Sequence, residues 1–105
     1  MKIFVYETLK NHKTLGDVLH HIPPTRDAVL PGYREVDHKT WPTLIRQADA
    51  SVKGKMFNVG PLDKHKLDAW EAHYARHAVD LADGTTAFAY ILDPTTLGKN
   101  LILLF

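Results

Sequence analysis

The first part of the chain alternates short runs of β-forming residues with one helical stretch. Residues 2–6 are mostly apolar and rich in β-forming side chains, which predicts a buried first strand. Residues 12–21 space their apolar side chains helically, and the two prolines that follow end this predicted helix. Residues 28–36 are typical of a strand that bends at Pro31-Gly32.

The middle of the chain predicts strands separated by polar breaks. Trp41-Pro42 indicates a loop, residues 43–45 a short strand, and residues 47–51 a polar turn. Residues 52–59, VKGKMFNV, are the clearest strand by alternation. Within it, Gly54 predicts a point where another backbone approaches closely, because glycine has no side chain to prevent that.

The last part of the chain predicts a second helix. The segment from Gly60-Pro61 opens it, because proline is favoured in the first turn of a helix. Leu62, Leu67 and Trp70 would lie on or near its buried side.

Two more strands are predicted at residues 77–81 and 86–92, joined by a hairpin turn at Asp83-Gly84. Residues 101–105, LILLF, would form a final apolar strand or helix end. Many short strands with at most two helices indicate one α+β domain over residues 1–105, with a curled or barrel-like sheet.

Composition narrows the functional classes. The net charge of +1 comes from 13 basic and 12 acidic residues without a basic stripe, so nucleic acid is not an expected partner. The chain has no cysteine, which excludes disulfides, thiolate nucleophiles and cysteine-based zinc sites. His73 and His77 are four residues apart, a spacing that would suit a metal on one helix, but residues 75–77 are expected in a turn entering a strand and no HExxH pattern is present, so no metal is expected.

The ends of the chain bear on location and assembly. The first ten residues lack the apolar region of a signal peptide, which runs about 7–15 residues. LILLF is far shorter than the roughly 20 apolar residues that span a bilayer. We therefore expect a cytoplasmic protein with no membrane partner. LILLF would be a buried edge strand or, if exposed, the contact of a homodimer.

The segment LDAWEAHYAR, residues 67–76, carries the residues best suited to catalysis. Glu71 follows an apolar helix face beside Trp70, and Tyr74 and Arg76 come shortly after it. A carboxyl group whose pKa is raised by burial can take and return a proton near neutral pH. The alternative is that Glu71 is a solvated carboxylate at a helix end, or an ion-pair partner of Arg76.

Six segments follow one another in an order that is typical of one family. They are FVYETLK, LPGY at 30–33, WP at 41–42, VKGKMFNV, LDAWEAHYARHAVDL and the strand at 87–91. In this order they resemble the γ-glutamyl cyclotransferase-like family, including its AIG2-like and γ-glutamylamine branches. The resemblance spans nearly the whole chain.

The resemblance implies a small mixed β-barrel with flanking helices and no cofactor. Family enzymes release a γ-glutamyl group as 5-oxoproline, by attack of the α-amine of the substrate on its own γ-carbonyl. The catalytic glutamate of the family, a general acid and base, corresponds to Glu71. The substrate loop corresponds to Tyr6, Glu7, Thr8 and Leu9.

Tyr33, Tyr74 and Arg76 are further candidate substrate contacts, each with a structural alternative. Tyr33 would be a packing residue, whereas Tyr74 and Arg76 would fix the loop after the second helix. Within the substrate loop, Tyr6 could belong to the core and Thr8 could cap a turn.

Position 7 departs from the family, which usually has glycine there. Glu7 adds bulk and a negative charge beside the expected seat of the glutamyl α-carboxylate. Three functions therefore stay open: a cyclotransferase, a module that binds a small molecule without turnover, and a structural protein with a filled cavity. An open polar pocket containing Glu71 favours the first two. A Glu71–Arg76 pair, with Glu7 or Trp41 plugging the pocket, favours the third.

Overall fold

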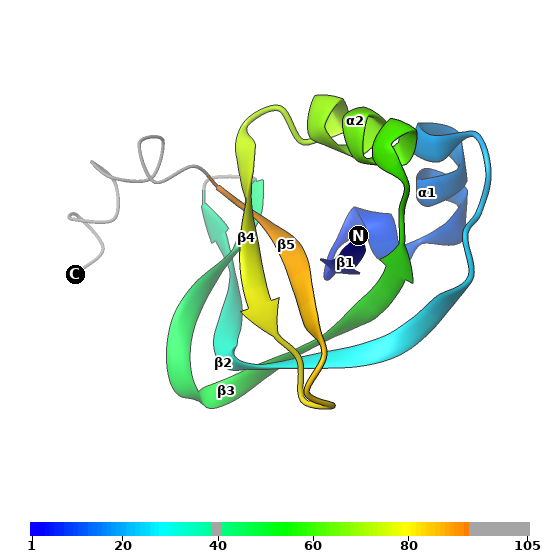
Figure 1. Ribbon diagram of the computed structural model, residues 1–105. Coiled ribbons are helices and arrows are strands. Elements are labelled where there is room, and N and C mark those ends of the chain that lie inside the picture. Colours follow the sequence, from blue (N-terminus) through cyan, green and yellow to red (C-terminus); the bar gives the residue numbers. More distant parts are fainter. Residues whose placement is uncertain (39–40, 93–105) are drawn as a thin grey trace.

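The computed structural model describes residues 1–38 and 41–92. In this part of the chain, five strands form one sheet that two α-helices accompany (Figure 1). The elements are β1 (Lys2–Val5), η1 (Thr8–Lys10, a 3-10 helix), α1 (His12–Leu19), β2 (Thr25–His38), β3 (Trp41–Asn58), α2 (Pro61–Trp70), β4 (Tyr74–Asp80) and β5 (Thr86–Leu92). The strand order is β2-β3-β1-β5-β4. The predicted α+β class is confirmed.

The central strand β1 separates two apolar clusters, because side chains of a strand alternate between the faces of its sheet. Phe4 and Tyr6 belong to a cluster that all five strands surround. Ile3 and Val5 belong to a second cluster, to which α1 and α2 contribute. Figure 1 shows both helices at the same side of the sheet. β1 is paired on both sides, antiparallel with β3 and parallel with β5.

The expectation of a closed barrel is wrong for the described residues, because the sheet curls without pairing its edges. β2 pairs only with β3, and β4 only with β5. The edges approach where the Ala82 N–H donates to the Val29 carbonyl at 2.9 Å, close to an ion pair of 2.9 Å between Arg26 and Asp83. A barrel requires a ladder between its first and last strands, and one backbone hydrogen bond does not supply it.

β3 is one strand of 18 residues, although the sequence predicted a loop, a short strand, a polar turn and a second strand. Residues 46–49 are exposed and lie where the pairing of β2 and β3 shifts register, between the pairs Tyr33–Arg46 and Pro31–Ser51. There Arg34 Nε donates to Gln47 Oε1 at 2.7 Å. Local polarity indicated a turn because the distant partner strand is not visible in the local pattern. The predicted bend at Pro31-Gly32 is confirmed by a register shift and by φ of 83° at Gly32.

The remaining predictions agree with the structure apart from element ends. Both helices, the first strand, the hairpin turn with Gly84 at φ 85° and the strand at residues 86–92 are confirmed. β4 begins at Tyr74, earlier than the predicted strand. The predicted element at residues 101–105, and the dimer contact suggested for it, lie outside the described residues.

Helix α2 buries less apolar surface than predicted. Leu67 is fully buried, but Leu62 is 67% exposed and Trp70 is 53% exposed. The helix has only ten residues, and Leu67 is the one that is buried. Its attachment therefore depends on polar contacts as well as on apolar packing.

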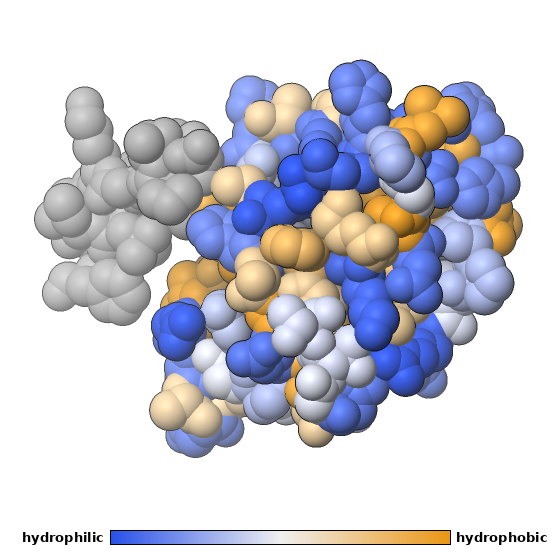
Figure 2. All heavy atoms as spheres, in the orientation of Figure 1, coloured by the Kyte–Doolittle hydropathy of each residue, from blue (hydrophilic) through white to orange (hydrophobic). Residues whose placement is uncertain are grey.

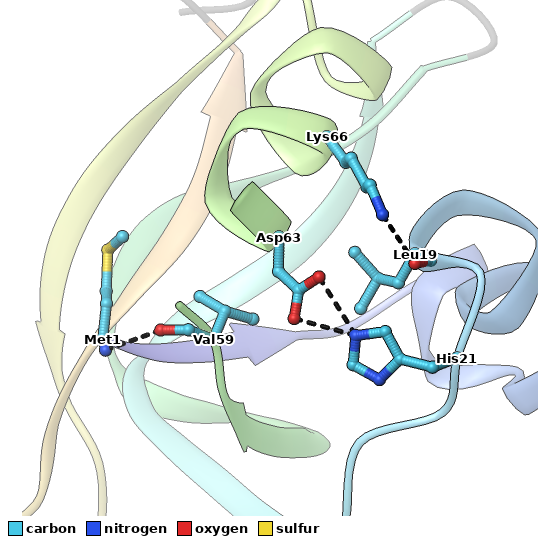
Figure 3. A network of polar contacts seen from close by, with 6 residues as sticks. All are labelled: Met1, Leu19, His21, Val59, Asp63 and Lys66. Carbon is cyan, nitrogen blue, oxygen red and sulfur yellow. Dashed lines mark hydrogen bonds and ion pairs between the residues drawn. The ribbon is translucent and has the colours of Figure 1, made fainter. Parts of the chain in front are cut away.

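Polar contacts hold α2 in place (Figure 3). His21, just after α1, places Nε2 2.9 Å from a carboxylate oxygen of Asp63, and Lys66 Nζ donates to the Leu19 carbonyl at 3.0 Å. The N-terminal ammonium group donates to the Val59 carbonyl, just before α2, at 3.0 Å. These contacts fix the position of the helix that leads to Glu71.

The surface gives little indication of a large docking face. On the face drawn in Figure 2, hydrophobic residues lie in separate patches among hydrophilic ones. Single exposed apolar side chains are normal on a protein surface. Within the described residues, no helix is long and apolar enough to cross a membrane.

Replacing Gly54 with alanine should destabilise the fold strongly. A Cβ atom there would overlap the Val5 carbonyl oxygen and lie 2.7 Å from the Phe4 ring, so β1 would have to shift. We expect a loss of about 3 kcal/mol or more in the free energy of unfolding, measured by urea denaturation. The control is Gly60→Ala, where nothing lies within 4 Å and the change should stay near 1 kcal/mol. Equal losses in both variants would contradict the prediction.

Candidate active site

A cavity of about 130 Å³ lies between the end of β1 and the C-terminal end of α2. Its walls come from β1 and the segment after it, the start of β3, the end of α2, β4 and β5. The lining residues are Phe4, Val5, Tyr6, Glu7, Leu9, Pro42, Trp70, Glu71, Tyr74 and Tyr90. The fold therefore brings the predicted catalytic glutamate and three residues of the predicted substrate loop to one cavity, although they are far apart in sequence.

The end of α2 carries Glu71 into the cavity. Glu71 caps the helix with φ −98° and ψ 42°, and its N–H donates to the Leu67 carbonyl at 2.8 Å. Its own carbonyl accepts from the Tyr74 N–H at 2.8 Å, which closes a tight turn into β4. Burial raises the pKa of the Glu71 carboxyl from 4.5 to about 7. Near neutral pH the group can therefore both accept and donate a proton.

Tyr6 lies on the cavity wall at the end of β1. It is 6% exposed, and its hydroxyl donates to the Tyr90 carbonyl at 2.5 Å. Burial, with smaller contributions from Tyr74 and Glu71, holds the pKa of the Tyr6 phenol above its usual value. The hydroxyl thus stays protonated, and it binds the backbone of β5.

Tyr74 lines the cavity at the start of β4 and fastens that strand to β3. Its hydroxyl donates to the Pro42 carbonyl at 2.7 Å, and its ring is stacked with Trp41 at a centroid distance of 6.2 Å. Burial, and then the charges of Glu71 and Glu7, raises the pKa of Tyr74 to about 12. Because its hydroxyl is bound to the backbone, Tyr74 has a structural role, while its ring forms part of the cavity wall.

Glu7 and Leu9 form the wall near η1. Leu9 is buried, and the Glu7 carbonyl accepts from the Lys10 N–H at 2.8 Å. Burial, followed by a hydrogen bond with Glu7 and the charge of Glu7, raises the pKa of Glu35 in β2 to about 7. Glu7 therefore lines the cavity and also affects the protonation of a second carboxyl group. The role predicted for Thr8 concerns a side chain outside the described part of the structure.

Two predicted substrate contacts, Tyr33 and Arg76, do not line the cavity. Tyr33 packs at the margin of the cluster that the strands surround, with the Arg46 guanidinium 5.6 Å from its ring centroid. Arg76 Nε donates to Asp68 at 2.8 Å. Arg76 therefore pairs with Asp68 and not with Glu71, so the ion pair that would have favoured a filled cavity is not formed.

Asp68 links the helix and strands beside the cavity through hydrogen bonds, a role that no local sequence signal indicated. It accepts hydrogen bonds from the Tyr90 hydroxyl at 2.7 Å and from the Arg76 guanidinium at 2.8 Å, and so joins α2 to β5 and β4. Only its spacing of four residues from Lys64 was visible in the sequence. Tyr90 and Glu35 were missed for the same reason, since both reach the site from other strands.

Replacing Glu71 with glutamine should change how stability depends on pH. Because folding raises the pKa of Glu71, its contribution to stability is complete below about pH 4.5 and is lost as the pH rises through about 7. Relative to Glu71→Gln, wild-type protein should lose on the order of 1–3 kcal/mol between about pH 5 and about pH 8. Urea unfolding of both proteins across this range measures the difference, and parallel stability curves would contradict the prediction.

Replacing Asp68 with asparagine should weaken the attachment of α2 to β4 and β5. Tyr90 and Arg76 would lose a charged acceptor, so we expect a loss of about 1–2 kcal/mol in the free energy of unfolding. Asp80→Asn is the matched control, because Asp80 is exposed and its carboxylate accepts a hydrogen bond from the Thr86 hydroxyl at 3.1 Å. The effect of this substitution should stay within about 0.5 kcal/mol. Equal thermal unfolding of the two variants would refute the role given to Asp68.

Solved structures share the fold of this chain. The solution structure of the Arabidopsis thaliana protein At5g39720.1 matches with a TM-score of 0.75 and 22% identity, over 97% of this chain and 80% of that one. The crystal structure of the uncharacterized protein PH0828 from Pyrococcus horikoshii matches with a TM-score of 0.70 and 19% identity, over 88% of this chain and 77% of that one. A structure named gamma-glutamyl cyclotransferase matches with a TM-score of 0.68 and 14% identity, over 88% of this chain and 66% of that one.

These identities establish the likeness of fold alone. A search of curated proteins finds no match to the chain. The sequence profile of the family described as "Gamma-glutamyl cyclotransferase, AIG2-like" matches residues 3–103, nearly the whole chain. The protein therefore belongs to the AIG2-like γ-glutamyl cyclotransferase family.

Proposed function

We propose that the protein is a cofactor-free enzyme that releases 5-oxoproline from a γ-glutamyl amine or amide, with Glu71 as general acid and base. The observation that carries this proposal is the position of the Glu71 carboxyl, which lines a cavity that raises its pKa to about 7. Family membership supports the class of reaction. The natural ligand in this proposal is a small molecule.

The proposed reaction is intramolecular, so the protein supplies no nucleophile. The α-amine of the substrate attacks its γ-carbonyl carbon, which forms the ring C–N bond of 5-oxoproline and then breaks the bond to the leaving nitrogen. Ionised Glu71 takes a proton from the attacking amine, and protonated Glu71 returns it to the leaving nitrogen. Holding the substrate folded can contribute roughly 7–11 kcal/mol to the lowering of the barrier.

The residues that line the cavity are arranged in a way that suits both proton transfer and holding of the substrate. We place the glutamyl group between Glu71 and the segment from Tyr6 to Leu9, both of which line the cavity. Trp70 and Tyr74 line the same cavity as Glu71, whose carboxyl group is partly buried. A carboxyl group in such surroundings exchanges protons at neutral pH more readily than a solvated one, because its pKa is close to the working pH.

Glu7 supports the second candidate function, a family member that binds a small molecule without turnover. Glu7 lines the cavity and its charge acts on Glu35, at a position where the family usually has glycine. A carboxylate ligand would be repelled there when both groups are ionised. A ligand of different charge would then be held beside Glu71 without cyclisation.

The proposal predicts that Glu71→Gln abolishes turnover. Glutamine keeps the size of the side chain but cannot exchange a proton, so the rate of 5-oxoproline release should fall about 10²-fold or more. The measurement is 5-oxoproline formation from a panel of γ-glutamyl amines, amides and peptides by both proteins. Asp80→Asn, which makes the same chemical change at an exposed position at the end of β4, should retain wild-type activity.

Two other results would overturn the enzymatic proposal. Turnover that survives in Glu71→Gln would remove Glu71 from the chemistry. Absence of turnover by the wild-type protein on every substrate, together with binding of the same compounds in calorimetry, would establish the binding function instead.

A further inference from the structure

A second pocket, of about 380 Å³, lies at the opposite end of β1 from the cavity that Glu71 lines. Its lining residues come from the start of β1, from the start of β2 with the residue before it, and from the end of β3; they are Lys2, Pro24, Thr25, Arg26, Met56, Phe57 and Asn58. None of them lines the Glu71 cavity. The volume lies within the roughly 300–1,000 Å³ that is typical of small-molecule sites, so the pocket can hold a ligand of its own.

Strand pairing brings two cationic side chains to one face of the sheet at this pocket. Lys2 of β1 pairs with Asn58 of β3, and Arg26 of β2 pairs with Met56 of β3. Paired residues share a face of the sheet, and so do residues two apart on one strand, so the Lys2 and Arg26 side chains point to the same side. Met56 is buried, whereas Lys2, Arg26 and Asn58 are exposed. The pocket therefore has positive groups from two strands above an apolar floor.

Contacts of a single nitrogen atom hold the Arg26 guanidinium group in place. Its Nη2 lies 2.9 Å from a carboxylate oxygen of Asp83, and it donates to the Thr85 hydroxyl at 3.3 Å and to the Met56 sulfur at 3.5 Å. In the described part of the chain, Nε and Nη1 of Arg26 make no hydrogen bond or ion pair. Asp83 compensates part of the positive charge, but it also orients a planar group whose other N–H donors stay available to an oxyanion.

Lys2 gives the pocket a positive charge that no carboxylate compensates. It takes part in no ion pair among the described residues, and the residues described as lining the pocket include no carboxyl group. Lys2, Arg26 and Asn58 together offer more N–H donors than the roughly four lone-pair sites of a carboxylate can accept. A phosphate group has three strongly accepting oxygens and up to two negative charges, so it fits this donor set better.

We propose that this pocket binds a small molecule that carries a phosphate group, through Lys2, Arg26 and Asn58. Lys2 supplies a point charge, Arg26 donates from its free nitrogens to the phosphate oxygens, and the Asn58 amide lies between the two cations on the middle strand. Met56 and Pro24 lie beside the organic part of the ligand. This site is separate from the Glu71 cavity and does not depend on the proposed enzymatic function.

The test is NMR chemical-shift mapping of the backbone amides with phenyl phosphate, benzoate and phenol at one fixed ionic strength. Phenyl phosphate should shift the signals of Lys2, Arg26 and Asn58 saturably, with a Kd of about 1 mM or below. Benzoate, which has one acceptor oxygen fewer and a smaller charge, should bind about tenfold more weakly. Phenol, which has the same ring without the anionic group, should cause no saturable shift.

Substitution of each cation should weaken this binding. Lys2→Gln and Arg26→Gln should each raise the Kd for phenyl phosphate by about tenfold or more, because each removes a charged hydrogen-bond donor. Lys53→Gln is the matched control, since Lys53 is exposed on β3 and does not line the pocket; it makes the same change in net charge and should alter the Kd less than about twofold. Thermal unfolding shows whether each variant folds. If Arg26→Gln does not fold, because it loses Asp83, Lys2→Gln decides the question alone.

Several outcomes overturn the inference. Absence of a saturable shift with phenyl phosphate, or binding that survives in Lys2→Gln, removes the site. Equal binding of benzoate refutes the assignment to phosphate, and equal weakening in Lys53→Gln reduces the effect to net charge. Shifts confined to the amides of Tyr6 and Glu71 would place the ligand in the other cavity. Glu71→Gln should bind phenyl phosphate as the wild-type protein does, because the two sites share no lining residue; failure of the enzymatic proposal therefore leaves this test unaffected.

Discussion

The candidate site depends on the position of β1, a strand of four residues in the middle of the sheet. Its alternating side chains fill two separate clusters, and its pairing on both sides prevents it from shifting along its axis. Gly54 of β3 permits the close approach of Val5 and Phe4 that this position requires. Because β1 ends beside the cavity, Tyr6 and Glu7 take their places from it.

Desolvation raises the pKa of two carboxyl groups in and near the cavity. Burial is the largest cause of the raised pKa of both Glu71 and Glu35, each to about 7. The two groups differ in their neighbours, since Glu7 also acts on Glu35, whereas burial alone acts on Glu71. A carboxyl group with a pKa near 7 therefore lines the cavity at Glu71, where it can exchange protons near neutral pH.

Membership of the family does not determine which substrate is bound, and the reason is physical. The fold supplies the cavity and the place of Glu71, but Glu7 and Trp70 also line the cavity and contribute to its charge and shape. These two residues lie in a loop and at a helix end, where substitutions cost little stability and can change what binds. The same scaffold can thus carry different ligands while its core stays the same.

The sequence by itself determined the helices and most of the strands, and it made Glu71 and the segment from Tyr6 to Leu9 candidate site residues. These features depend on local periodicity, on turn residues and on the order of short segments. Only the tertiary structure decided that residues 41–58 form one strand, that the sheet stays open, that Arg76 pairs with Asp68 and that Glu7 acts on Glu35. Each of these depends on contacts between distant segments, and such contacts leave no local pattern in the chain.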